Sequence, residues 1–170
     1  PLLSTRKRAA DRWRPNTTVA AVIERNGLFL MVEEDTADGL RLNNPAGHLD
    51  PGESPQDACS REVLEETRHR FKPQALIGVY LSRFTKTGTG EDVTYLRLAY
   101  TGELGEQVAG AQFDEGIVGT VWMSYAELQA SQARHRSPLL MRCIDDYLAG
   151  KRYPLELVQT DPSVLQAPAV

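Results

Sequence analysis

The chain has 170 residues, of which 41% are hydrophobic and 25% are charged, and its net charge is −4 at pH 7. This composition is typical of a folded globular protein, and the length suits one domain with a sizeable core but is short for two. The negative charge excludes a general attraction to nucleic acid or to an anionic membrane, so an anionic substrate would need local basic groups or a bound cation.

Cysteine usage and hydropathy indicate the compartment and the domain limits. Cys59 and Cys143 lie far apart in no metal-ligand spacing, so we expect reduced thiols and a cytoplasmic location. No apolar run approaches the length that spans a bilayer, and the N-terminus lacks the apolar segment of a secretory signal. We expect an N-terminal tail at residues 1–15, one domain at 16–155 and a C-terminal tail at 156–170.

The first half of the chain predicts two strands, a loop and a helix. Residues 17–24 and 28–33 are rich in β-branched and apolar side chains, and "RNG" between them favours a tight turn. A long loop at 35–54 is marked by Gly, Pro and Asn. A helix is predicted at about 55–69, because Ser54 can cap it and a proline fits its first turn.

The second half of the chain predicts three strands followed by two helices. Residues 75–85, 93–104 and 116–124 predict strands, whereas 125–131 and 137–150 predict a short and a longer helix. Mixed strands with helices on both sides predict the α/β class and a layered sandwich.

The predicted helix at 55–69 carries an acidic stripe. At about 100° per residue, Glu62, Glu65 and Glu66 share an arc about 100° wide, and Cys59 and Val63 lie beside it on the expected buried seam. Like charges at these spacings destabilise a helix by a few tenths of a kcal/mol per pair, so a positive charge should compensate.

Two readings of this stripe are open from the helix alone. Arg61 is one cation, but a single guanidinium cannot neutralise Glu53 and the three helical carboxylates together. Clustered hard oxygen ligands suit Mg²⁺ or Mn²⁺, which in turn hold phosphate oxygens. The alternative is a solvated acidic face without a ligand.

The residues before the helix favour the metal reading. Six residues stand at characteristic spacing: Gly47, Glu53, Arg61, Glu62, Glu65 and Glu66. This pattern resembles the Nudix box, the signature of the Nudix hydrolases. The box normally continues with Gly and an apolar residue, where this chain has Arg68 and His69. That Gly ends the helix in the left-handed conformation, which costs another residue about 1 kcal/mol, so the helix end is open.

The resemblance implies a Nudix-type α/β/α sandwich with a mixed sheet and a metal site in the box. In the family, the last glutamate pair of the box, here Glu65 and Glu66, binds the divalent cation. We expect this cation to be Mg²⁺, with Mn²⁺ able to substitute. Glu62 is a further ligand or the base that activates water, and the backbone carbonyl of Gly47 completes the metal site. Glu53 pairs with Arg61 and orients the carboxylates.

The resemblance also implies an activity. The segments "LNNPAGHLD", "VTYLRLAY", "HRSPLL" and "GKRYPLELV" are similar to those of small bacterial Nudix phosphatases. The implied reaction is metal-dependent hydrolysis of diphosphate linkages in nucleoside tri- and diphosphates and in hydroxymethylpyrimidine pyrophosphate, with release of orthophosphate. We expect a small-molecule substrate, no nucleic-acid or membrane partner, and a monomer, since no exposed apolar patch is evident.

Further site residues are less specific. Glu115, beside Asp114 in the loop before residue 116, is a candidate second base or ligand, and an ordinary polar turn is the alternative. Arg83 and Arg97 lie in predicted strands and suit phosphate binding, although each could instead form a surface ion pair. His48 near the expected metal, and Trp13 or Tyr95 as a stacking platform for a base, have equally ordinary structural alternatives.

Two other activities remain open. A box-bearing isoprenoid diphosphate isomerase would need a catalytic cysteine near the metal, and Cys59 falls on the buried seam instead. A catalytically silent nucleotide sensor would have lost box carboxylates, and none is lost.

Overall fold

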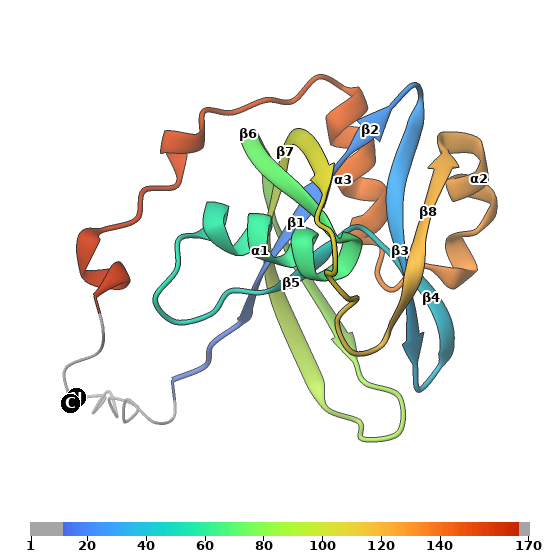
Figure 1. Cartoon of the computed structure of the whole chain (residues 1–170). Helices are drawn as coiled ribbons and strands as arrows, with labels where there is room; N and C mark the ends of the chain where they lie inside the picture. Colours follow the sequence, from blue (N-terminus) through green and yellow to red (C-terminus); the bar gives the residue numbers. More distant parts are fainter. Residues whose placement is uncertain (1–11, 167–170) are drawn as a thin grey trace, which may run out of the picture.

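The computed structural model describes residues 12–166 (Figure 1). The N-terminal tail predicted at 1–15 lies almost wholly outside these residues. The strands are β1 (Asn16–Val22), β2 (Glu24–Arg25), β3 (Leu28–Thr36), β4 (Gly39–Asn43), β5 (Ala46–His48), β6 (His69–Thr85), β7 (Asp92–Gln107) and β8 (Ile117–Ser124). The helices are α1 (Pro55–Thr67), α2 (Tyr125–Ala130) and α3 (Leu139–Leu148), with short 3₁₀ turns η2 (Gln132–Arg134), η3 (Leu155–Leu157) and η4 (Pro162–Leu165).

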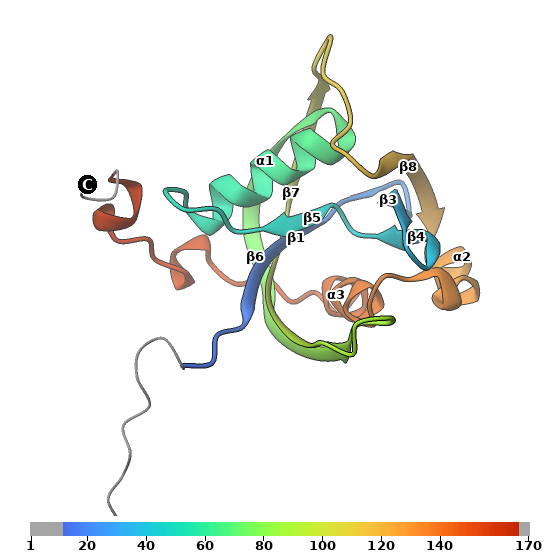
Figure 2. The ribbon, with the colours of Figure 1, turned by 90° about the horizontal axis from the view of Figure 1, so that it is seen from below.

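The strands form two sheets. The first has the order β5-β1-β7-β6 and is mixed, because β1 runs parallel to β7 while the β5–β1 and β6–β7 pairs are antiparallel. In the second, β3 pairs with β2, β4 and β8, all antiparallel. Helices α1 and α3 lie on opposite sides of the first sheet (Figure 2). The predicted α/β class, with a mixed sheet between helices, is confirmed.

The central strand β1 is buried on both faces, as its apolar sequence requires. Val19 and Ala21 point towards α1, where they join Cys59 and Val63 in one apolar cluster. Val22 belongs to a second cluster with residues of α3. The alternation places a packed core on each side of the sheet and fixes the helix that carries the acidic stripe.

Helix α1 begins as predicted and ends two residues earlier. The Ser54 hydroxyl accepts a hydrogen bond from the Asp57 N–H at 3.1 Å, and Pro55 occupies the first turn. At the other end Arg68 itself adopts the left-handed conformation, with φ of 62°, and its N–H donates to the Leu64 carbonyl at 2.8 Å. The helix therefore ends where the box glycine would end it.

Two predicted loop regions contain regular structure. The loop expected at 35–54 includes β4 and β5, and β6 begins at His69 rather than at residue 75. These short or irregular segments carry little periodicity of their own, and they become strands by pairing with distant partners. Strand β5, for example, pairs with β1.

The stretch expected as a tail from residue 156 continues along the fold. Tyr153 exchanges two backbone hydrogen bonds with Leu76, which attaches the chain to β6. Leu155 and Val158 then pack, partly buried, against the apolar cluster beneath α1. Among the described residues, no helix is long and apolar enough to cross a membrane.

Candidate active site

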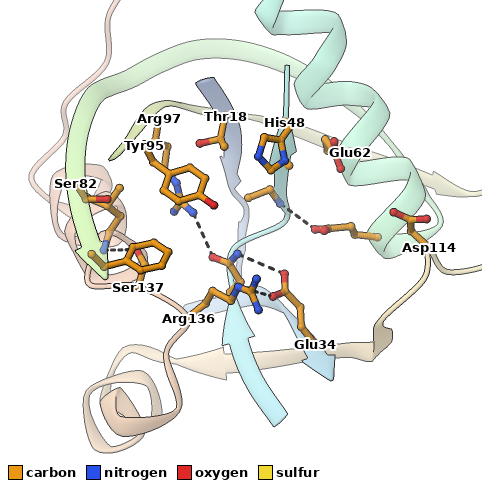
Figure 3. A pocket seen from close by; sticks show the side chains of 16 residues that line it. Thr18, Glu34, His48, Glu62, Ser82, Tyr95, Arg97, Asp114, Arg136 and Ser137 are labelled. Carbon is orange, nitrogen blue, oxygen red and sulfur yellow. Dashed lines mark hydrogen bonds and ion pairs between the residues drawn. The ribbon is translucent and has the colours of Figure 1, made fainter. Parts of the chain in front are cut away.

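A pocket of about 320 Å³ opens between the part of α1 that carries Glu62 and Glu66 and the curved hairpin of β6 and β7 (Figure 3). Its lining residues come from both halves of the chain: Thr18, Glu34, Asn43, Ala46, Gly47, His48, Glu62, Glu66, Ser82, Phe84, Tyr95, Arg97, Asp114, Arg136, Ser137 and Leu139. In Figure 3, Glu62 and Asp114 lie on one side, and Tyr95, Arg97 and Ser82 lie across the cavity.

Two buried glutamates form the acidic wall. Glu62 and Glu66 are only 8% and 6% exposed. Burial raises the pKa of Glu66 to about 9, although the Ala46 N–H donates to its Oε2 at 2.9 Å and acts in the opposite direction. Nearby carboxylates of Glu34, Glu62 and Asp114 raise this pKa further. The wall therefore concentrates acidic oxygens that favour added positive charge.

Glu62 has a mixed environment. Burial raises its pKa above the ordinary value, and this effect outweighs the opposing hydrogen bond from Arg61. The Arg61 Nη1 donates to Glu62 Oε1 at 2.8 Å. A carboxylate with a raised pKa can hold or release a proton closer to neutral pH than a free one.

Arg61 organises the carboxylates around it. Its Nε and Nη2 donate to the two oxygens of Glu53 at 3.0 and 2.8 Å, a bidentate pair that lowers the pKa of Glu53. Its Nη1 also donates to Glu65 at 3.1 Å, and its Nη2 to the His48 carbonyl at 2.9 Å. One guanidinium therefore ties the loop before α1 to the helix itself.

Gly47 is required by a close approach rather than by its backbone angles. A Cβ at this position would overlap the carboxylate of Glu62. Strand β5 pairs with β1 through Gly47 and Val19, which brings the backbone of residue 47 against the acidic wall. The glycine thus leaves room for the carboxylate beside its own peptide group.

The opposite wall holds a buried arginine. Arg97 is 6% exposed and donates long hydrogen bonds to Asn44 and Asn43, at 3.3 and 3.4 Å. It forms no ion pair within residues 12–166. Thr18, its neighbour across the β1–β7 pairing, has a buried hydroxyl without a partner in the described chain. This wall offers hydrogen-bond donors and positive charge to a ligand.

Arg136 and the aromatic residues complete the pocket. The Arg136 Nε lies 3.3 Å from Glu34 Oε2, and Glu34 also accepts a long hydrogen bond from Asn43. Phe84 and Tyr95 are stacked, with ring centroids 5.5 Å apart and planes 11° from parallel. The His48 ring lies 6.1 Å from that of Tyr95.

Comparison with known proteins identifies the family of this chain. Residues 13–143 match the model of the NUDIX domain. The chain belongs to the Nudix hydrolase family.

Individual relatives agree with this assignment. The chain is 40% identical over 149 residues to phosphatase NudJ of Escherichia coli K12 and of Shigella flexneri, covering 86% of this chain and 92% of each relative. A NUDIX hydrolase structure from Nitrosomonas europaea is 50% identical, with a TM-score of 0.79 over 87% of this chain and 98% of that one. A MutT NUDIX hydrolase from Burkholderia pseudomallei shares the fold at 16% identity, with a TM-score of 0.64 over 79% and 98%.

The Nudix box residues divide into two groups in this structure. Gly47, Glu62 and Glu66 line the pocket, whereas Glu65 is 41% exposed and is held by Arg61 outside it. Within residues 12–166 no three acidic, histidine or cysteine side chains stand at metal-ligand spacing. The oxygen donors are nevertheless of the kind that hard divalent cations prefer, and family members use such ions. These oxygen donors therefore suit the ion by their chemistry, while in this structure Arg61 binds Glu62 and Glu65.

Two predicted substrate or base residues lie outside the pocket. Arg83 is exposed and pairs with Asp92, because Ser82 and Phe84 point into the pocket and the alternating strand turns Arg83 to the other face. Glu115 is exposed, and its neighbour Asp114 lines the pocket instead. In this structure neither side chain lines the pocket, whereas those of Arg97, also predicted, and Asp114 do.

Several pocket residues were not foreseen from the sequence. Glu34 follows the apolar run of β3, and this change from apolar to acidic at a strand end was the available signal. Arg136 and Ser137 lie in the "HRSPLL" segment that resembles other Nudix proteins, but the segment itself gives no direction for their side chains.

Two remaining candidates are also placed by the structure. Trp13 is exposed and does not line the pocket. Cys59 is buried, its Sγ lies 3.6 Å from the Ala20 carbonyl, and burial raises its pKa. A thiol in this position is a poor nucleophile and does not reach the pocket, which disfavours isomerase chemistry.

Proposed function

We propose that the protein hydrolyses diphosphate linkages in nucleoside tri- and diphosphates, with Mg²⁺ as the cofactor and Mn²⁺ able to replace it. The observation that carries the proposal is the acidic wall: Glu62 and Glu66 are buried, and burial raises the pKa of both. Such a wall is unfavourable when charged and becomes favourable when a divalent cation neutralises it.

Glu62, Glu65, Glu66 and the Gly47 carbonyl would hold the cation. Glu53 keeps Arg61 in place through the bidentate pair, and Arg61 in turn orients the carboxylates of Glu62 and Glu65 that would be ligands. When bound, the ion would neutralise negative charge on the phosphate oxygens. Glu66 would have to release the proton that burial favours before its carboxylate could hold the ion.

The chain's own groups would perform the proton and positioning steps. As the alternative to its role as a ligand, Glu62, with its raised pKa, would accept a proton from the attacking water at a carboxylate oxygen, and the Asp114 side chain lines the same pocket from the loop before β8. Arg97 and Arg136 hold the phosphate chain from the opposite wall. The stacked Phe84 and Tyr95 offer a surface for a planar base.

The similarity to phosphatase NudJ supports release of orthophosphate. We extend the proposal to hydroxymethylpyrimidine pyrophosphate, a small aromatic diphosphate that could use the same walls. We further propose that the protein is a cytoplasmic monomer with one catalytic domain at residues 16–155. It would act on small molecules and bind neither nucleic acid nor membranes.

A substrate screen tests this function. Purified protein is incubated with Mg²⁺ and a panel of nucleoside tri- and diphosphates, nucleotide sugars and hydroxymethylpyrimidine pyrophosphate, with orthophosphate and pyrophosphate detected separately. Orthophosphate release from nucleotides, abolished by chelation of the metal, is expected. Tight nucleotide binding without phosphate release would refute the proposal and indicate a sensor, whereas rearrangement of an isoprenoid diphosphate would indicate an isomerase.

A further inference from the structure

The loop that carries Asp114 into the pocket is attached to the end of α1. The Val108 N–H donates to the Arg68 carbonyl at 2.8 Å, and the Asp114 N–H donates to the Glu65 carbonyl at 3.0 Å. On the far side of the loop, the Asp35 N–H donates to the Gly116 carbonyl at 2.8 Å. Residues 108–116 are therefore held between the box helix and β3.

One side-chain contact adds to these backbone bonds. The guanidinium of Arg68 lies over the ring of Phe113, with Cζ 4.0 Å from the ring centroid. The Nε of Arg68 is buried and has no hydrogen-bond partner in the described part of the chain. The guanidinium of Arg68 therefore makes a cation–π contact with the face of the Phe113 ring. Phe113 directly precedes Asp114 in the sequence.

Arg68 occupies this position at a conformational cost. It is one of two non-glycine residues with positive φ among residues 12–166, and it replaces the glycine that the Nudix box places there. A glycine would adopt the same backbone without strain but could not contact Phe113. An observed strained residue beside an active site is a reason to look for a functional contact, and the contact here is with the loop that carries Asp114.

We infer that Arg68 is a positioning residue, which stacks on Phe113 and so holds Asp114 at the acidic wall of the pocket. This inference rests on the proposed hydrolysis for its catalytic consequence. Arg68 thus has a strained backbone at the end of α1, and its side chain contacts the loop that carries Asp114.

Arg68→Gly separates this role from simple helix capping. The substitution restores the box glycine and relieves the left-handed strain, so Tm should stay within about 3 °C of wild type or rise. The kcat for nucleotide hydrolysis should nevertheless fall by roughly three- to thirty-fold, the range that corresponds to loss of a partly desolvated cation–π contact. The KM should change by less than about twofold, because Arg68 does not touch the pocket. Arg68→Lys, which keeps the cation, should retain most of the activity.

Two double variants show the route of the effect. If Arg68 acts through the ring and then through Asp114, Arg68→Gly should have little further effect on kcat in a Phe113→Leu or an Asp114→Asn background. A wild-type kcat in Arg68→Gly, or the same fall in all three backgrounds, would overturn the inference while leaving the proposed hydrolysis intact.

Hydrogen exchange tests the anchor without relying on turnover. The Asp114 amide should exchange roughly three- to thirty-fold faster in Arg68→Gly than in wild type, while the amide of Leu30 in the core stays unchanged. An unchanged Asp114 amide would overturn the inference. A wild-type protein that is inactive towards every substrate would instead refute the proposed function, and the exchange experiment would still decide whether Arg68 holds the loop.

Discussion

The backbone of Gly47 lies against the carboxylate of Glu62, so closely that any Cβ at residue 47 would overlap it. This contact joins a short strand to the box helix at the point where the proposed metal site forms. It explains in steric terms why only glycine fits there, and it makes the position a sensitive test of the site.

Gly47→Ala should displace the Glu62 carboxylate and lower kcat by about 100-fold, because misplacement of a reacting group by about 1 Å can have an effect of this size. Steady-state kinetics with the best nucleotide from the screen measures it. Gly119→Ala is the matched control, since a Cβ there meets no atom within 4 Å. Equal kcat values for the two variants would show that the Gly47 contact is unimportant for turnover.

Arg61→Ala should lower the free energy of unfolding of the metal-free protein by about 2–3 kcal/mol, because it leaves the partly buried carboxylates of Glu53 and Glu62 without their cation. Urea unfolding measures the change. Arg70→Ala removes an exposed pair with Glu106 and should cost less than about 0.5 kcal/mol. The prediction fails if the two losses are the same.

The stability of the metal-free protein should fall as pH rises from about 4.5 to about 9. Burial raises the pKa of Glu66 from 4.5 to about 9, so in this window the folded state binds more protons than the unfolded state. Urea midpoints at several pH values measure the slope, which Glu66→Gln should reduce and the exposed-site control Glu106→Gln should not. Stabilisation by added Mg²⁺ should grow with pH, since the ion binds the deprotonated carboxylate. A Glu66→Gln protein with the wild-type slope would assign the effect to other groups.

Arg97→Lys should raise the KM for nucleotides by about ten- to a hundred-fold, since lysine keeps the charge but loses the forked donors that suit a phosphate. Arg83→Lys should change KM by less than about twofold, because Arg83 pairs with Asp92 outside the pocket. Initial-rate measurements on both variants, with Tm as a check on folding, compare the two arginines directly. A larger effect at Arg83 would place the substrate on the outer face of the hairpin.

These two arginines also show what the sequence could and could not predict. Both lie in predicted strands and both suit phosphate, but the alternation of a strand does not say which face meets a pocket. Arg83 and Arg97 were separated only when the partner strands and the curvature of the hairpin were known. Asp114 and Glu115 differ in the same way, because adjacent turn residues point in different directions.

The box helix was predictable because its information is local. Ser54, Pro55 and the acidic stripe are read within a few turns, and the buried seam with Cys59 and Val63 follows from helical spacing. The pairing of Glu34 with Arg136 joins residues about a hundred positions apart, and no local pattern encodes it. The part of the pocket opposite the box depends on such distant pairs.

The most direct test of the central claim is a Mn²⁺ titration followed by electron paramagnetic resonance, on wild type, Glu66→Gln and the exposed-site control Glu106→Gln. We predict that wild type and the control bind the ion with equal affinity and that Glu66→Gln binds it at least about tenfold more weakly. Equal affinities in all three proteins would contradict the assignment of the acidic wall as a divalent-metal site.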